Sequence, residues 1–133
     1  MNMKEWNAKF IMYRRTIKHL KDAVNRDLST QGISLQHATY LLLLADKGQL
    51  RIKDLSALSD NDGALTTRAL KVLKDKNLID RTCDSVRRCK IFLTDKGKDV
   101  VNYIGEVFAR LRDELAKSAA GEGQEALLSA ILS

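Results

Sequence analysis

Two stretches of this 133-residue sequence carry side chains whose types and spacing could do chemistry, and both are rich in arginine and lysine. The first covers residues 63–76. On a wheel of 100° per residue, a polar face that begins with small residues separates from an apolar face. The polar face holds Ala64, Thr67, Arg68, Lys71, Lys74 and Asp75, and the other face holds Leu65, Thr66, Ala69, Leu70, Val72 and Leu73.

The polar face has the chemistry to read double-stranded DNA. Arg68 has the forked geometry for guanine, Lys71 can reach a base or a phosphate, and Thr67 suits a phosphate or a thymine methyl. Small first residues let the helix N-terminus approach the DNA backbone. The alternative is the solvated face of an ordinary amphipathic helix. The predicted DNA contacts on this helix are Ala64, Thr66, Thr67, Arg68, Lys71 and Lys74.

The second stretch is the basic tip of a predicted hairpin, residues 84–90. It joins two short runs typical of β-strands, residues 78–83 and 89–93, and includes the start of the second run. A guanidinium on a projecting hairpin can enter the minor groove of DNA, where narrow A·T-rich sections concentrate negative potential. We therefore predict that Arg87, Arg88 and Lys90 also contact DNA. The alternative is a charged tip that only keeps the hairpin soluble.

The sequence favours a binding protein over an enzyme. It contains no glycine-rich phosphate loop, HExxH motif, paired carboxylates in an apolar setting or nucleophile elbow. His19 and His37 fall on different predicted helices without further Cys or His ligands, so we predict no metal and no cofactor. Tyr13, His37 and Tyr40 could line a ligand pocket between the first two helices, with core packing as the alternative role.

Composition narrows the class further. With 44% hydrophobic and 30% charged residues, no proline and seven scattered glycines, the chain resembles a helical globular domain more than a disordered, membrane or all-β protein. Residues 1–9 lack the apolar region of a signal peptide, so we expect a cytoplasmic protein. Cys83 and Cys89 are then expected to be free thiols, facing each other across the hairpin.

The charge is unevenly spread along the chain. The formal net charge is +6, but residues 1–49 contribute 8 Lys and Arg against 4 Asp and Glu, residues 50–98 contribute 12 against 7, and residues 99–133 contribute 3 against 6. A basic body with an acidic end suits a polyanionic partner on one side of the molecule.

Long helices are expected at both ends of the chain. Residues 2–28 form the first, since apolar residues recur at spacings of three and four: Met3, Trp6, Phe10, Tyr13, Ile17, Leu20 and Val24. A narrow stripe on a long helix needs a second helix to cover it. This stripe and a second one from Val100 to Leu115 predict a homodimer formed by residues 2–28 and 95–132. The second of these segments includes a short last helix around Leu127 to Leu132.

Between these helices lie the elements that must position the basic side chains. Helices are expected at residues 35–47, 52–59 and 63–76, with a short extended piece at 49–51 and the hairpin before Thr94. This order is the winged helix-turn-helix plan. The predicted fold is mainly α with a small β-hairpin wing, in which a winged helix-turn-helix DNA-binding lobe at about 34–98 and a helical dimerisation lobe form a single domain over 1–133.

Three motifs within residues 35–98 resemble the MarR family of bacterial transcription regulators. They are Thr67-Arg68-Ala69-Leu70 continuing to Leu73, Asn77-Leu78-Ile79-Asp80-Arg81, and Leu93-Thr94-Asp95-Lys96-Gly97 after the wing. The family wing usually reads Asp-x-Arg. Here Arg87 matches the arginine, but Ser85 stands where the aspartate belongs and Asp84 comes one place early.

The resemblance implies a homodimer that binds a roughly palindromic operator, usually as a repressor, and that is sometimes released by a small aromatic effector or by thiol oxidation. The alternative is a winged-helix module in which helix 63–76 meets a protein and does not bind DNA specifically. Weak retention on heparin and no shift of random duplex DNA at low salt would favour that alternative.

Overall fold

The computed structural model describes residues 2–117 of the chain, with side chains described up to residue 114. Within these residues the predicted order of elements is confirmed: α1 (Met3–Ser29), α2 (Leu35–Lys47), β1 (Gln49–Leu50), α3 (Ile52–Ser59), α4 (Gly63–Asp75), β2 (Ile79–Ser85), β3 (Arg88–Leu93) and α5 (Asp95–Lys117). No helix in this part of the chain is long and apolar enough to cross a membrane.

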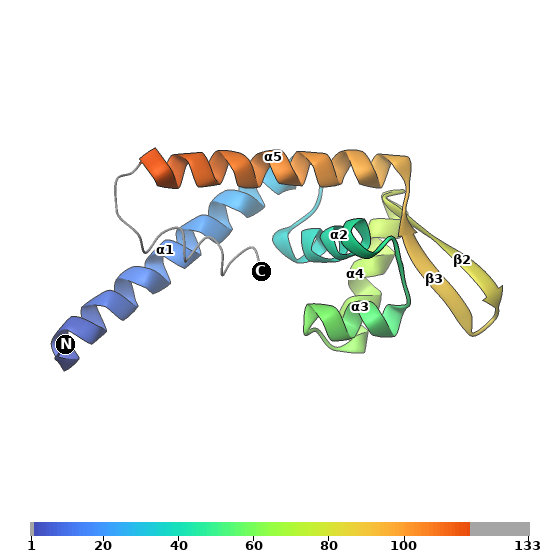
Figure 1. Cartoon of the computed structure of the whole chain (residues 1–133), viewed down its shortest axis with the longest axis horizontal. Coiled ribbons are helices and arrows are strands. Elements are labelled where there is room, and N and C mark those ends of the chain that lie inside the picture. Colours follow the sequence, from blue (N-terminus) through green and yellow to red (C-terminus); the bar gives the residue numbers. More distant parts are fainter. Residues whose placement is uncertain (1, 118–133) are drawn as a thin grey trace.

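The elements form two regions that share α5 (Figure 1). At one end, the second half of α1 packs against α5 through buried residues such as Leu28 and Ile104, while the first half projects away. At the other end, α2, α3 and α4 pack together, and the β-strands extend outwards as a wing. Because α2 contacts α1, α3, α4, β3 and α5, it is the central core helix that its nearly all-round apolar sequence predicts.

Local side chains start the helices. Asn2 caps α1 by accepting a hydrogen bond from the Glu5 backbone at 2.9 Å. The side chain of Asn25 on α1 accepts from the first backbone N–H of α2, at Leu35, over 2.6 Å. This contact fixes the angle at which the chain leaves α1, because it joins a donor at the start of α2 to the preceding helix.

The three strands form an antiparallel sheet in the order β1-β3-β2. Leu50 pairs with Ile91, and along the wing Ile79 pairs with Leu93 and Cys83 with Cys89. Both strands of the wing run further than predicted, because Ser85 pairs with Arg88 and leaves only a two-residue turn. The pairing shifts by one residue between Cys83 and Ser85, which makes Asp84 the extra residue of a β-bulge.

The stripe on α1 is covered only in part. Leu20 and Val24 are buried within the chain, whereas Met3, Trp6, Phe10 and Tyr13 are exposed. On α3, Leu55 is buried as its spacing predicts, but Ile52 and Leu58 are exposed. The expectation for a short last helix around Leu127 to Leu132, and for the stripe at Leu115, concerns side chains outside the described residues.

Candidate nucleic-acid interface

The second helix of the helix-turn-helix, α4, presents the predicted polar face to solvent. Its N-cap Asp62 accepts a hydrogen bond from the Leu65 backbone at 2.7 Å, and Gly63 has open space beside it. Along the helix Ala64, Thr67, Arg68, Lys71, Lys74 and Asp75 are exposed. Val72, which the wheel assigns to the apolar face, is exposed as well. The first turn therefore combines small exposed residues with the positive end of the helix dipole, an arrangement that suits a phosphate.

The prediction that Thr66 contacts DNA is wrong. Thr66 is fully buried, and its hydroxyl lies 3.1 Å from the hydroxyl of Tyr40. The side-chain amide of Asn61, in the turn between α3 and α4, donates to the same Tyr40 hydroxyl at 2.9 Å. Ser56 on α3 in turn donates to the Asn61 carbonyl at 2.6 Å. These four residues form a hydrogen-bonded network that holds α3 and α4 to α2.

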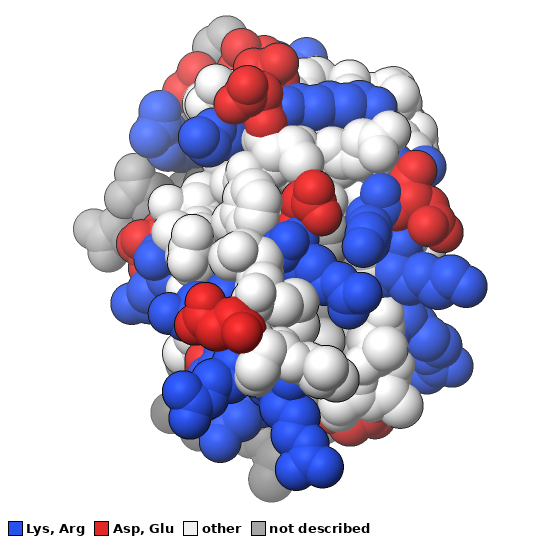
Figure 2. Space-filling view, turned by 90° about the vertical axis from the view of Figure 1, so that its right-hand side faces the viewer, with Lys and Arg blue, Asp and Glu red and all other residues white. Residues whose placement is uncertain are grey.

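The wing carries its cations into solvent. Val86 and Arg87 form the turn, Arg88 opens β3, and all three side chains are exposed, as is Lys90. Figure 2 views the molecule from the wing side, and Lys and Arg side chains occur across this face with smaller groups of Asp and Glu between them. The ion pairs among the described residues do not include Arg87. Its charge is therefore available to a partner.

Cys83 and Cys89 are joined by a disulfide bond, so the expectation of two free thiols is wrong for this structure. The predicted cross-strand register is confirmed, because the two residues are direct partners with their Cα atoms 4.1 Å apart. That separation is close to the spacing of a non-hydrogen-bonded pair of antiparallel strands, in which side chains approach each other most closely. The bond closes the tip of the wing.

The base of the wing is attached to α5 by close backbone contacts. The Thr94 hydroxyl caps α5 by accepting from the Gly97 backbone at 3.0 Å, and it donates to the Asn77 carbonyl at 2.6 Å. Asn77 follows the end of α4 in a left-handed conformation, φ 61°, which asparagine adopts more readily than most residues. A Cβ atom on Gly97 would collide with the carbonyl oxygen of Leu78, so only glycine lets α5 start this close to the wing.

Tyr13, His37 and Tyr40, the predicted lining of a ligand pocket, have three separate surroundings. Tyr13 is on the exposed half of α1, and Tyr40 belongs to the buried network. His37 accepts a hydrogen bond from the Ser34 backbone through Nδ1 at 3.2 Å, which caps α2. Burial, and then the positive charge of Lys76, lower the pKa of His37 below its usual value. Tyr40 therefore has a core role and His37 a capping role, whereas Tyr13 has neither.

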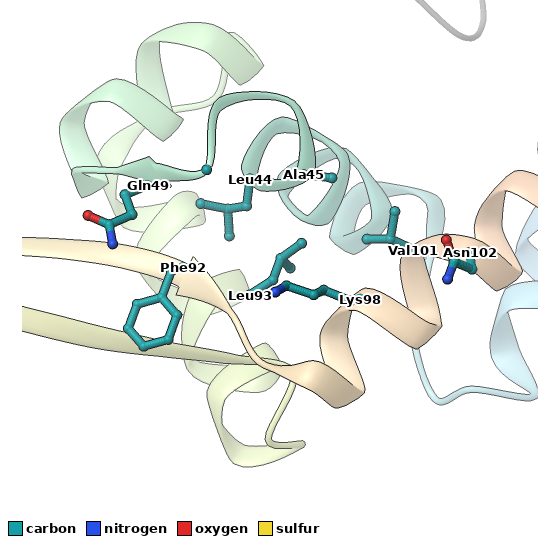
Figure 3. A pocket seen from close by; sticks show the side chains of 9 residues that line it. Leu44, Ala45, Gln49, Phe92, Leu93, Lys98, Val101 and Asn102 are labelled. Carbon is teal, nitrogen blue, oxygen red and sulfur yellow. The ribbon is translucent and has the colours of Figure 1, made fainter.

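A cavity of about 650 Å³ lies elsewhere, between the end of α2, strands β1 and β3, and the start of α5 (Figure 3). Leu44, Leu93 and Val101 contribute apolar walls, and Phe92 borders the cavity from β3 with its ring on the other side of the strand from Leu93. Lys98, whose ammonium points across the opening in Figure 3, supplies a cation beside the amides of Gln49 and Asn102. This lining suits a small molecule with an apolar body and an anionic group.

Sequence reasoning missed Arg81 as part of the basic surface. Its side chain is exposed on β2, and it lines the groove between α4 and the wing together with Thr67, Lys71 and Lys74. The missed signal was the strand period. Arg81 stands two residues after buried Ile79 and pairs with Ile91, so its side chain is on the same face of the wing as theirs, the face that lines the groove with α4.

Solved structures with the same fold are transcription regulators. MepR, a transcription regulator of the Staphylococcus aureus multidrug efflux pump MepA, is 22% identical with a TM-score of 0.75, over 91% of this chain and 91% of that chain. An S. aureus MepR variant bound to an oligodeoxyribonucleotide is 23% identical with a TM-score of 0.69, over 93% and 92% of the two chains.

A MarR family transcriptional regulator from Silicibacter pomeroyi is 21% identical with a TM-score of 0.67, over 93% of this chain and 84% of that chain. No protein-family model matches the sequence. The chain therefore has the winged helix-turn-helix fold of MarR family regulators, as the three sequence motifs predicted.

Proposed function

We propose that this MarR-like chain is a sequence-specific DNA-binding transcriptional regulator, a cytoplasmic repressor that binds a palindromic operator as a homodimer. One observation carries the proposal. The exposed cations of α4 and the exposed arginines of the wing belong to one lobe of the molecule, separated by a groove that Lys71, Lys74 and Arg81 line. This arrangement matches a helix in the major groove with a hairpin reaching an adjacent minor groove.

Each part of this surface has its own role in the proposal. Thr67, Arg68 and Lys71 on α4 contact base edges or phosphates of the major groove, with Ala64 leaving room for the backbone. Lys74 and Lys90 neutralise phosphates. Arg87 enters the minor groove from the tip of the wing, and Arg88 supports it from the first position of β3. No catalytic group is required for this activity.

The exposed half of α1 supports a homodimer. Trp6 and Phe10 are 59% and 64% exposed, which is unusual for large apolar side chains that follow each other four residues apart on one stripe. A second copy of the chain would bury this stripe and place two α4 helices on one DNA duplex. Two-fold symmetry of the protein then requires a palindromic site with half-sites about one helical turn apart.

A small aromatic acid is the class of effector that the cavity of Figure 3 suits. Its carboxylate would pair with Lys98 while its ring lies against Leu93 and Val101. Because the lining spans β3 of the wing and the start of α5, an occupant would act on the joint between the two regions. Calorimetry measures the binding of salicylate, which is expected to weaken in a Lys98→Ala variant. Binding should persist in Lys96→Ala, which removes a lysine outside the lining of the cavity.

Selection of bound sequences from random duplex DNA tests the regulator function. The expected result is one enriched palindrome whose binding weakens steeply with salt. Arg68→Ala should then cost about 1–3 kcal/mol and relax the preference at one base pair in each half-site, whereas Lys71→Ala at a phosphate should lower the salt slope by about one. Lys18→Ala, which removes an exposed lysine on α1, is the matched control and should change neither.

The competing function is a protein-interaction module. Weak retention on heparin, no shift of random duplex DNA at low salt and no enriched sequence would together reject the regulator. Equal losses for Arg68→Ala on the selected and random DNA would reassign Arg68 to a phosphate contact.

A further inference from the structure

The wing beyond the pair of Arg81 with Ile91 lies outside the hydrophobic core. Ile79 is buried at the base of β2, but every later residue of that strand, from Asp80 to Ser85, is exposed. An isolated two-stranded hairpin is marginally stable in water, because few side chains bury surface against it. The outer wing therefore depends on the contacts between its own two strands, and the covalent contact among them is the disulfide between Cys83 and Cys89.

We propose that Cys83 and Cys89 form a reversible redox pair that sets the DNA affinity of the wing, with the oxidised form binding more tightly than the reduced form. This inference rests on the proposed DNA-binding function and adds a regulatory input to it. Ser85 and Arg88 are the last paired residues before the turn that carries Arg87. The disulfide joins the next pair towards the base of the wing.

The position of the bond determines which conformations it restricts. Its cysteines are separated by six positions, and the five residues between them include the bulged Asp84 as well as Arg87 and Arg88. A bulge interrupts the ladder of hydrogen bonds between two strands. Without the disulfide, β2 and β3 would therefore be held together less firmly next to the two-residue turn. Closing the loop removes conformations from the tip before DNA arrives, and a pre-ordered arginine loses less entropy on binding.

The surroundings of the two sulfur atoms suit reversible chemistry. Cys83 is exposed and Cys89 is half-buried, so solvent reagents can reach the pair. Positive charges on Arg81, Arg87, Arg88 and Lys90 surround it in the sequence, against Asp80 and Asp84. A net positive neighbourhood stabilises the thiolate, which is the form that attacks an oxidant.

The oxidant in this proposal is a hydroperoxide. One thiolate attacks the peroxide oxygen, the O–O bond breaks, and water (or an alcohol) leaves with a proton, which produces a sulfenic acid. The second thiol attacks that sulfur, the S–S bond forms and the hydroxyl departs as water. Two thiols thus lose two electrons and two protons to one peroxide. A dithiol reductant reverses the step by thiol–disulfide exchange.

The test compares two forms of the full-length chain on the same DNA. One sample is reduced with dithiothreitol and the other is oxidised with hydrogen peroxide, and mass spectrometry checks the two-hydrogen difference between them. Fluorescence anisotropy then measures the affinity for the selected duplex with A·T-rich flanks. The oxidised form is expected to bind about three- to tenfold more tightly, which corresponds to the ordering of a few side chains and a short backbone segment.

Two variants identify the source of the difference. The double variant Cys83→Ser, Cys89→Ser should bind like the reduced wild type and should not respond to peroxide. Arg87→Ala should still form the bond, but its two forms should differ less in affinity, because the arginine that the bond orders is gone. Hydrogen exchange at residues 84–88 should be faster in the reduced wild type than in the oxidised one, whatever DNA is present.

Several results would overturn the proposal. They are equal affinities of the two forms, tighter binding by the reduced form, failure of peroxide to join the two cysteines, or a serine double variant that still responds. If both forms fail to bind any duplex, the regulator function fails as well. If both bind the selected duplex equally, the regulator stands and only the redox inference is lost.

Discussion

The hydroxyl groups of Tyr40 and Thr66 lie 3.1 Å apart in the core, where they join α2 to α4. Both side chains are fully buried, and the Asn61 amide completes the contact by donating to Tyr40. Burying a hydroxyl costs free energy unless it is hydrogen-bonded. Because the Tyr40 and Thr66 hydroxyls bond to each other, they are satisfied in one orientation of α4 relative to α2. The orientation of the exposed face of α4 thus depends on a polar contact on its buried face.

Tyr40→Phe is expected to destabilise the protein by about 1–2 kcal/mol, because it leaves Thr66 and Asn61 without their shared partner. Urea unfolding measures this loss. Hydrogen exchange at residues 60–63 should accelerate, since the turn loses its anchor. The matched control is Tyr103→Phe, which removes a hydroxyl bonded to the Asp27 carbonyl on α1 and should leave exchange at 60–63 unchanged. Unchanged exchange in Tyr40→Phe would show that packing alone holds the turn.

Gly97→Ala is expected to cost about 1–3 kcal/mol, since the added methyl group would meet the carbonyl oxygen of Leu78 and force α5 away from the wing. Gly105→Ala provides the control on the same helix. Nothing lies within 4 Å of a Cβ at Gly105, so this change should stabilise the protein by about 0.5–1 kcal/mol through helix propensity. Thermal unfolding of both variants gives the comparison, and a neutral Gly97→Ala would contradict the close contact.

His37 is expected to make stability fall in mild acid. Its pKa is lowered in the folded protein, so the unfolded chain binds the proton more readily. Stability contributed by neutral His37 is full well above its ordinary pKa of 6.5, falls as the pH drops through that value, and levels off below the lowered pKa of the folded state. Protonation also removes the Nδ1 acceptor of the cap.

The His37→Gln variant keeps an acceptor at this capping position but cannot titrate. Between pH 7.5 and pH 5.5 it should lose less stability in urea unfolding than the wild type does. His19→Gln, at an exposed position on α1, serves as the control and should follow the wild type. Parallel losses in all three proteins would assign the pH dependence to other groups.

Phe10→Glu is expected to weaken the proposed homodimer, because association would bury a charge within the apolar stripe of α1. Light scattering over a dilution series should show monomers at concentrations where the wild type is dimeric. Ile11→Glu places the same charge one residue on and about 100° around the helix, at another exposed position, and should affect association less. A monomeric wild type would reject the dimer itself.

The sequence by itself determined the elements and much of the basic surface. Periodicity predicted the helices, because apolar side chains that recur every three or four residues match the period of a helix and not that of a strand. The bounds of α2 and α3 agree with those predicted. Asn77 follows α4 in the left-handed conformation that asparagine tolerates. Arg68 and Lys71 are exposed because their positions on the wheel oppose the apolar face of α4.

Tertiary structure decided what covers each surface, because that depends on residues far apart in the sequence. Thr66 is buried since Tyr40, 26 positions earlier, offers its hydroxyl a partner. The end of the α1 stripe at Leu20 and Val24 is buried where α1 packs against α5 and α2. The cavity beside Lys98 combines α2, β1, β3 and α5. For the disulfide the sequence predicted the cross-strand pairing of Cys83 and Cys89, but not the bond that the structure has between them. A linear pattern shows which residues are apolar or charged, but only packing in three dimensions selects their partners.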